Sequence, residues 1–181
     1  MKILIASDLH GDYESAKLLL SLYNQECCSK LVLLGDILYH GPRNQLPVNY
    51  NPQAVIELLN QNSDKILAVR GNCDTEVDQM VLNFPILADY CYLCLDGLSI
   101  FATHGHRHNT TTPPPLKAGD ILLHGHTHIL KSEDFGNKNH YLNPGSISIP
   151  KNNNPKSYMI YENRCFTIKS IDGEIIIQKS F

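Results

Sequence analysis

Residue types that can hold divalent metal occur in five short blocks of this 181-residue chain. The seven side chains are Asp8 and His10 in Ser-Asp-Leu-His-Gly, Asp36 in Leu-Gly-Asp, Asn72 in Gly-Asn-Cys-Asp, His104 in Thr-His-Gly, and His126 and His128 in Gly-His-Thr-His. Three oxygen ligands and four imidazoles are more than one ordinary ion needs. The set suits two ions that share a bridging carboxylate, and such pairs hydrolyse phosphate esters with metal-activated water.

The spacing within two of the blocks supports this interpretation. In Asp8-Leu9-His10 the two ligands are two residues apart, and on extended backbone they would face the same way and clasp one ion. His126-Thr127-His128 offers the same arrangement. A single Asp after a strand is usually a turn or cap residue, and a lone His is usually structural. Five blocks of this kind together favour one metal centre.

Apolar runs predict the elements that carry these blocks. Residues 2–7, 31–34 and 66–69 are typical of strands buried on both faces. Residues 13–25 and 53–60 carry apolar side chains at helical spacing. The order predicts a parallel sheet with right-handed crossovers. The long segment between residues 37 and 52 contains three prolines and is expected to be a functional loop.

The second half of the chain is expected to be antiparallel. Asp96-Gly97 lies between strand-like residues 90–95 and 98–103, a strong hairpin signal. Further strands are predicted at 121–123, 158–161, 165–168 and 174–178, and Asn143-Pro144-Gly145-Ser146 forms a turn at the centre of 141–149. The whole predicts one α/β domain over residues 1–181, with two stacked sheets and helices outside. Because sites in open α/β sheets collect at the carboxyl ends of strands, the metal-ligand blocks should meet at one rim.

Bulk properties limit the partners. The formal net charge of −3 gives no electrostatic basis for stable nucleic-acid binding. The first apolar run is too short for a secretory leader, and no stretch of about 18 apolar residues predicts a membrane span. A soluble cytoplasmic protein is the expectation.

The six cysteines are expected to be buried free thiols rather than disulfides. Cys91 and Cys94 have zinc-knuckle spacing, but they lie in a predicted strand, where positions three apart face opposite sides. They are therefore interpreted as core thiols.

The order Asp-x-His, Gly-Asp, Gly-Asn-x-Asp, His, Gly-His-x-His resembles that of the calcineurin-like metallophosphoesterases, from Asp8 to the turn at residues 143–146. The size, the Gly-Asn-Cys-Asp block and the His40-Gly41-Pro42-Arg43-Asn44 segment look most like the small bacterial phosphodiesterases of the YfcE type. The resemblance implies a four-layer αββα sandwich of two mixed sheets flanked by helices. It also implies a phosphodiesterase that acts on small phosphate diesters through a metal-bridged hydroxide. Relatives commonly assemble as homo-oligomers, and the same is expected here.

The resemblance also implies which residues bind each of the two ions. Asp8, His10 and His128 would hold the first ion, Asn72, His104 and His126 the second, and Asp36 would bridge them. Asp36, Asn72 and His104 are expected to act in catalysis as well as in metal binding. Imidazole and oxygen ligands without thiolate suit Mn, Fe or Zn better than Mg or Ca, and the resemblance favours Mn²⁺.

Cys73 departs from the family pattern, because many relatives have a histidine there that assists the leaving oxygen. A thiol is a weak acid at neutral pH and a poor hydrogen-bond donor. We therefore expect slow hydrolysis of alkyl esters and a preference for aryl diesters, whose leaving group needs no proton.

Four other residues have weaker assignments. Arg43 is a candidate phosphate clamp, although a surface role is the simpler interpretation. Asp74 and His106 are candidates for orienting ligands from behind. His124 precedes the Gly-His-Thr-His block but is left out of the metal set. His40, His108 and His140 have no assignment.

Two alternatives stay open from the sequence. The same site could serve a phosphomonoesterase or a nucleotide pyrophosphohydrolase. A non-catalytic interaction scaffold is the alternative from a different class, since some eukaryotic relatives of this fold have degraded metal sites. The pocket shape, and hence the substrate, depends on residues 37–52 and 106–119, whose conformation the sequence does not predict.

Overall fold

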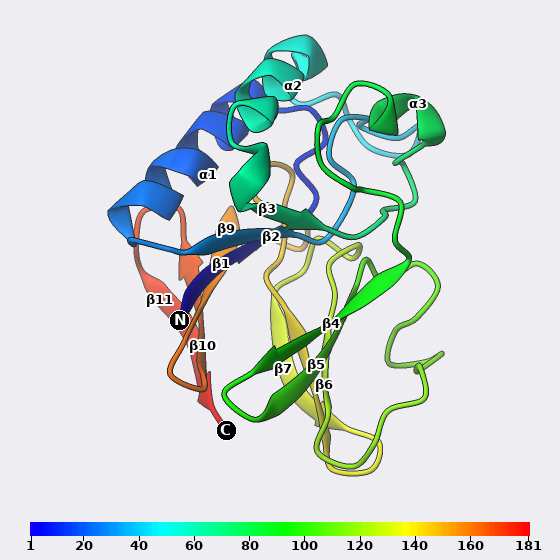
Figure 1. Cartoon of the computed structure of the whole chain (residues 1–181), viewed down its shortest axis with the longest axis vertical. Coiled ribbons are helices and arrows are strands. Elements are labelled where there is room, and N and C mark those ends of the chain that lie inside the picture. Colours follow the sequence, from blue (N-terminus) through cyan, green and yellow to red (C-terminus); the bar gives the residue numbers. More distant parts are fainter.

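A computed structural model describes residues 1–181 and shows two β-sheets packed face to face (Figure 1). The eleven strands are β1 (Lys2–Ala6), β2 (Lys30–Leu33), β3 (Ile66–Ala68), β4 (Tyr90–Leu95), β5 (Leu98–Thr103), β6 (Ile121–Leu123), β7 (Lys131–Phe135), β8 (Asn139–Asn143), β9 (Ser157–Glu162), β10 (Cys165–Ser170) and β11 (Ile175–Ser180). The helices are α1 (Tyr13–Gln25), α2 (Pro52–Asn60), the short α3 (Glu76–Gln79) and a 3₁₀ turn at Ser63–Lys65.

The first sheet has the order β11-β10-β9-β1-β2-β3. β1, β2 and β3 pair in parallel, as the alternation of strands and helices predicted. The chain later returns to this sheet, because β9 pairs antiparallel with the other side of β1 and is followed by the β10 and β11 meander. The sheet is therefore mixed.

The second sheet has the order β4-β5-β6-β8-β7. The Asp96-Gly97 hairpin joins β4 and β5 as predicted. The expectation of an antiparallel second half is met by β4–β5, β7–β8 and the β9-β10-β11 meander, but it was wrong for the middle of this sheet, where β5, β6 and β8 pair in parallel. Two connections bring the chain back to the edge of the sheet where β5 begins: the loop before β6, and the antiparallel strand β7 before β8. As a result β5 and β6 end at one rim.

Side chains alternate between two cores. Ile3 and Ile5 of β1 face the second sheet, and they share the inter-sheet core with residues such as Ile100 and Ile121. Leu4 and Ala6 face the opposite way, toward α1 and α2. The period of two in the strand and the apolar faces of the helices therefore fill both layers.

The fold class is confirmed: two mixed sheets are flanked by helices. The helical cover is unequal, since α1 and α2 both lie over the first sheet (Figure 1). On the outer face of the second sheet, Phe101, Leu122 and Tyr141 are covered by Leu116 from a loop and by Phe135 of β7.

The helices begin where side chains can cap them. Asp12 accepts a hydrogen bond from the Ser15 backbone N–H at the start of α1 (2.8 Å), and Asn51 accepts one from the Ala54 N–H at the start of α2. Pro52 occupies the first turn of α2, where its missing N–H has no partner to lose. No helix in the structure has the length and apolar character needed to cross a bilayer.

All six cysteines are free, as expected. The prediction that they are buried was wrong for most of them. Cys28 and Cys73 are buried, Cys91 and Cys165 are half-buried, and Cys27 and Cys94 are exposed. Cys94 is exposed because the hairpin strand β4 lies at the edge of the second sheet, so one of its faces points to solvent.

Candidate metal centre

The seven residues selected from the sequence all follow strands that end at one rim of the two sheets. Asp8, Asp36 and Asn72 come after β1, β2 and β3, while His104 and His126 come after β5 and β6. The facing sheets therefore contribute ligand residues from opposite sides.

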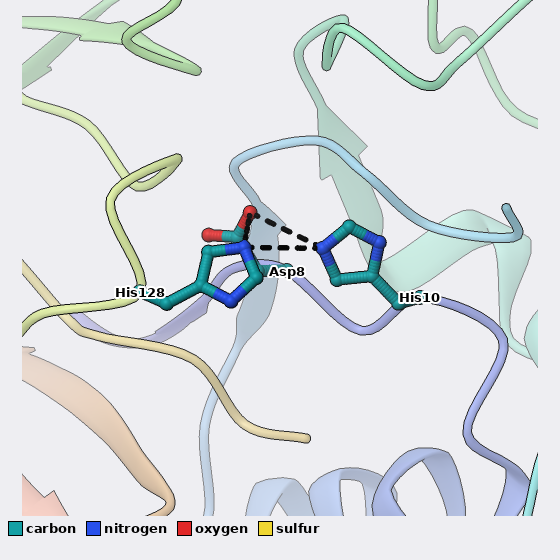
Figure 2. Close-up of side chains that lie close together, drawn as sticks. All are labelled: Asp8, His10 and His128. Atoms are coloured by element: carbon teal, nitrogen blue, oxygen red, sulfur yellow. Dashed lines mark hydrogen bonds and ion pairs between the residues drawn. The ribbon is translucent and has the colours of Figure 1, made fainter. Parts of the chain in front are cut away.

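Asp8, His10 and His128 converge into one half of the centre, and Figure 2 shows the three side chains pointing toward one another. The Asp8 Oδ1 atom lies 3.3 Å from His128 Nε2 and 3.7 Å from His10 Nε2. The two imidazole Nε2 atoms are 3.3 Å apart. All three side chains are buried.

Asn72, His104 and His126 form the other half. His104 Nε2 lies 3.1 Å from Asn72 Oδ1 and 3.2 Å from His126 Nδ1. The His104 ring is fully buried, whereas Asn72 is exposed toward the pocket.

Asp36 lies between the two halves. Its Oδ2 atom is 3.7 Å from His10 Nε2 and 3.4 Å from His104 Nε2, so one carboxylate oxygen faces a ring of each group. Its other oxygen, Oδ1, accepts a hydrogen bond from the Cys73 backbone N–H (2.8 Å). The carboxylate is thus oriented by the chain behind it and presents one oxygen to both halves.

Backbone carbonyls orient three of the imidazoles. The Nδ1 atoms of His10, His104 and His128 lie 2.8, 2.6 and 2.7 Å from the carbonyl oxygens of Tyr39, Leu34 and Ile149 respectively. A ring that donates its Nδ1–H to a carbonyl presents its Nε2 lone pair inward, as metal-bound histidines do.

Left-handed backbone, rather than the extended backbone expected from the sequence, brings the ligand side chains together. Asp8, His10, Asp36, His126 and His128 all have φ between 51° and 66°. Such φ values are uncommon for residues other than glycine and cost free energy, and they cluster at functional sites. The Asp-x-His and His-x-His pairs therefore converge through strained turns.

The metal-free chain places positive charge on His104. Burial by itself would lower the pKa of this imidazole, but Asp36 and Asp8 outweigh it and raise the pKa to about 9. Burial would likewise raise the pKa of Asp8, yet the His10 and His128 rings hold it well below its usual range. For His126, burial and the neighbouring His104 lower the pKa to about 4. A cation at the centre would replace the charge that His104 carries.

The residues present fit a metal centre. Asp8 Oδ1 is buried and accepts no hydrogen bond, an arrangement that costs free energy unless a cation or donor satisfies it. With their Nδ1–H groups donated to carbonyls, neutral His10 and His128 rings place two lone pairs against each other, which is favourable only if a cation or proton lies between them. Imidazole and hard oxygen donors together match divalent first-row metals.

Asp74 holds two of the ligand-bearing turns together. Its carboxylate accepts hydrogen bonds from the backbone N–H groups of Asp36 (2.9 Å), Ile37 (2.9 Å) and Gly71 (2.7 Å). Gly71 is required by this close approach, since a Cβ there would overlap Asp36 Oδ1 and the Asp36 backbone nitrogen. The orienting role expected for Asp74 is therefore seen in its contacts.

His106 makes no contact of that kind, whereas the His124 Nδ1 atom lies 3.0 Å from the Gly125 carbonyl oxygen in the turn that carries His126. His106 lies near the His104 ring, with 5.4 Å between ring centroids, but its buried Nδ1 has no hydrogen-bond partner. His124 stacks on Tyr141, and burial lowers its pKa to about 4.

The end of β8 and the segment after it form hydrogen bonds to the turns that carry Asp8 and His126, a role that was not predicted from the sequence. The Ser146 and Ser148 hydroxyls both donate to the Asp8 carbonyl oxygen, at 2.8 and 2.7 Å. The buried Asn143 side chain donates to the Gly125 carbonyl (2.9 Å) and so holds the turn that carries His126. The Asn-Pro-Gly-Ser sequence signalled a turn, but its partners are about 20 to 140 residues away in the chain.

A pocket of about 250 Å³ opens on the centre and is called the metal pocket below. It is lined by Asp36, Arg43, Asn44, Asn72, His126, Thr127, His128 and Lys151. Arg43 is an exposed residue that lines this pocket, so it is placed to contact a bound phosphate. Lys151 was not singled out from the sequence. Neither cation makes a salt bridge in the structure.

Cys73 lies beside the metal pocket rather than in its lining. Its Sγ atom accepts a hydrogen bond from Asn72 Nδ2 (3.1 Å), and burial and then Asp36 raise the pKa of the thiol. The side chain thus stays a neutral thiol.

Comparison with known proteins agrees with this geometry. Residues 1–164 match the family model described as the calcineurin-like phosphoesterase superfamily domain. The chain is 45% identical to phosphodiesterase YfcE of Escherichia coli over 98% of this chain and 96% of that one. It is 28% identical to the probable metallophosphoesterase YsnB of Bacillus subtilis, over 95% and 91% of the two chains.

Solved structures show the same fold. The structure of YfcE, described as a phosphoesterase from E. coli, superposes with a TM-score of 0.96 at 44% identity and covers 99% of both chains. Vacuolar protein sorting 29 from Cryptosporidium parvum superposes with a TM-score of 0.64 at 17% identity, covering 99% and 98% of the chains. The second likeness concerns the fold alone.

Proposed function

The chain belongs to the calcineurin-like phosphoesterase superfamily, and we propose that it hydrolyses small phosphate diesters with two divalent cations, Mn²⁺ being the expected metal. The enzyme class follows from the family and from the 45% identity with a phosphodiesterase over nearly the full chain: this is a metal-dependent phosphoric diester hydrolase. The binuclear site, the metal and the preferred ester are the finer parts of the proposal.

One observation supports the binuclear site most strongly. Asp36 Oδ2 faces His10 Nε2 on one side and His104 Nε2 on the other, with Asp8 and His128 completing the first half and Asn72 and His126 the second. Asp8, His10 and His128 would hold one ion, Asn72, His104 and His126 the other, and Asp36 would bridge them. Asp36, Asn72 and His104 are thus the proposed catalytic residues.

The bound ions would supply Lewis acidity toward the phosphate and would make water acidic enough to serve as the nucleophile at neutral pH. The chain supplies the rest. Asn72 contributes a neutral ligand, which leaves more positive charge at its ion than a carboxylate would. Arg43 and Lys151 bring two cations to the same pocket, where they can bind the non-bridging oxygens of the phosphate and orient it.

The experiment that tests this proposal measures metal content and hydrolysis together. Protein stripped with a chelator and reloaded with Mn²⁺ should bind two ions per chain and should hydrolyse bis(4-nitrophenyl) phosphate. Asp36→Asn should lower the ion count and reduce kcat by at least a hundredfold, whereas Asp172→Asn, an exposed carboxylate, should do neither.

Three results would contradict the proposal in different ways. A stoichiometry of one ion would remove the bridging role of Asp36. Bound metal without hydrolysis of any ester would favour an interaction scaffold. Faster hydrolysis of aryl phosphomonoesters or of nucleotide pyrophosphates than of diesters would keep the site and change the substrate.

We infer the preference for aryl diesters from Cys73. Its weakly donating thiol stands where many relatives of the family carry histidine, so alkyl leaving groups receive little help. Cys73→His should raise kcat for an alkyl diester several-fold more than kcat for an aryl diester. Cys28→His cannot serve as a control, because Cys28 is buried in the core, so Cys94→His at an exposed thiol is the matched variant. An unchanged ratio of alkyl to aryl rates in Cys73→His would show that the thiol does not set the preference.

A further inference from the structure

The metal pocket continues into cavities of different chemistry on its two sides. On one side it shares His126 and Thr127 with a cavity of about 340 Å³, called the polar lobe. On the other side it shares Arg43, Asn44 and Asn72 with a cavity of about 310 Å³, called the neck. Shared lining residues mean that these spaces adjoin.

The neck leads on to a fourth cavity. It shares Tyr39, Cys73 and Thr75 with a space of about 380 Å³ between α2 and α3, called the apolar lobe. The order along the surface is therefore polar lobe, metal pocket, neck and apolar lobe.

The apolar lobe is lined mainly by hydrophobic side chains, among them Tyr39, Tyr50, Ile56, Val77 and Val81. Several of these are unusually exposed for their type: Val77 is 69% exposed, and Tyr39 and Val81 are each 42% exposed. Exposed apolar side chains that line one hollow next to a reaction centre are typical of a ligand-binding surface.

The polar lobe is lined mostly by residues with polar side chains, together with carbon surface from residues such as Ile129 and Tyr141. Thr110 supplies a hydroxyl, the Thr127 hydroxyl already accepts a hydrogen bond from Asn143 Nδ2 (3.0 Å), and Lys131 and Glu133 form an ion pair at 3.0 Å. The Thr110 hydroxyl has no hydrogen-bond partner within the chain. A ligand that carries hydroxyl groups would find donors and acceptors here.

We propose that the preferred substrate is an unsymmetric phosphate diester, with a hydroxyl-bearing ester group in the polar lobe and an apolar ester group in the apolar lobe. The proposal rests on the phosphodiesterase function above and names its substrate class. The phosphate occupies the metal pocket, where Arg43 and Lys151 lie. Each lobe is large enough to hold a group the size of a sugar or a bicyclic aromatic ring.

The test uses phosphinates, whose two carbon–phosphorus bonds are not hydrolysed, as binding probes for the manganese-loaded enzyme. Naphthylmethyl(methyl)phosphinate reports on the apolar lobe, 2,3-dihydroxypropyl(methyl)phosphinate on the polar lobe, and dimethylphosphinate on the metal pocket alone. Dissociation constants are measured by titration calorimetry, so that the readout does not depend on turnover.

Val77→Asn and Val81→Asn should weaken the naphthylmethyl probe about threefold to tenfold, the loss expected from part of one apolar side chain. They should leave the dihydroxypropyl probe unchanged. Thr110→Val should give the opposite pattern. Val48→Asn and Thr112→Val are the matched controls, since Val48 is 97% exposed and neither residue lines these cavities.

The inference is wrong if the two sets of variants affect both probes alike, if neither set changes any probe, or if dimethylphosphinate binding falls in parallel. These outcomes are distinct from failure of the proposed function. If the enzyme hydrolyses diesters but the two sets of variants do not affect the two probes differently, the proposed function stands and the assignment of the two lobes is wrong. If the variants affect the two probes differently but the enzyme hydrolyses no diester, the two lobes are supported and the proposed phosphodiesterase function is wrong.

Discussion

Arg43 and Lys151 bring positive charge to a pocket whose floor is formed by buried carboxylates and imidazoles. Neither side chain is neutralised by a salt bridge, so both charges are available to an anionic substrate. A guanidinium can bind two phosphate oxygens at once, whereas an ammonium acts as a point charge. The two residues should therefore contribute unequally.

Arg43→Ala should raise KM for an aryl phosphodiester about tenfold, and Lys151→Ala should raise it a few-fold, because partly exposed charges of this kind contribute about 0.5–1.5 kcal/mol. Steady-state kinetics at saturating Mn²⁺ measure both. Lys117→Ala removes a cation that lines none of these cavities and should leave KM unchanged. Normal KM values in both pocket variants would exclude a role in substrate binding.

At the level of single residues, type and spacing were enough to select the cluster, since few patterns place four imidazoles and three oxygens after strands. The residues that support the cluster were not predictable in the same way. Ser146, Ser148 and Lys151 are ordinary loop residues in sequence, and only the return of the chain beneath Asp8 gives them their contacts. The strained φ of the ligand residues was also hidden, because local sequence suggested extended backbone.

The elements themselves followed from local signals where these were strong. α1 and both strands of the Asp96-Gly97 hairpin have the predicted bounds. β7 was missed because Lys131–Phe135 is mostly polar, as suits an edge strand with one neighbour. The parallel pairing of β5, β6 and β8 depends on crossovers through an irregular loop before β6 and through the polar strand β7 before β8, and no apolar periodicity predicts those.

The turn at Gly71 after β3 and the turn at Asp36 after β2 approach so closely that there is no room for a side chain at position 71. Gly71→Ala should destabilise the fold by about 1–3 kcal/mol and weaken Mn²⁺ binding, because the new methyl group would displace Asp36. Thermal unfolding and metal titration measure the two effects. Gly119→Ala is the control, since it meets no atom within 4 Å: it should lower stability through its φ of +90° while leaving metal affinity unchanged. Equal metal affinities in the two variants would contradict the argument.

Glu26 at the end of α1 connects the helix to two strands through Lys2 of β1 and Lys169 of β10, each at 2.6 Å. Burial would raise the pKa of Glu26, but the two lysines outweigh it and lower the pKa below its ordinary value of 4.5. The folded chain therefore binds fewer protons than the unfolded chain in this range. The stabilisation is complete above pH 4.5 and is lost as the pH falls through the folded-state pKa.

Glu26→Gln should accordingly lower the melting temperature at pH 7, and its difference from the parent should shrink between pH 5 and pH 3. Glu14→Gln, which removes an exposed carboxylate from the same helix, should change the melting temperature little at either pH. A difference for Glu26→Gln that stays constant down to pH 3 would show that its loss is not electrostatic.

For the molecule as a whole, the metal centre joins the two sheets. Asp8, Asp36 and Asn72 follow strands of the first sheet, while His104 and His126 follow strands of the second. Ions bound by the proposed ligands of both sheets would stabilise the folded chain relative to the unfolded one, and the stabilisation would grow with the logarithm of the ion concentration over Kd.

Mn²⁺ at a hundredfold excess over Kd should add about 2.7 kcal/mol and raise the melting temperature by roughly 5–10 °C. Calorimetry with and without a chelator measures the shift. Asp36→Asn should lose most of it, and Asp172→Asn should retain it. An equal shift in both variants would locate the stabilising ion elsewhere in the molecule.

The left-handed turns of Asp8, His10, Asp36, His126 and His128 carry an implication for ancestry. Glycine or asparagine at these positions would relieve the backbone strain. A homologue that no longer needed the metal site could therefore gain thermal stability by such substitutions. Loss of the metal-ligating residues and a rise in folding stability should then occur together. In this chain all five positions carry Asp or His in spite of the strain, which is the arrangement expected where the side chains are needed for metal binding.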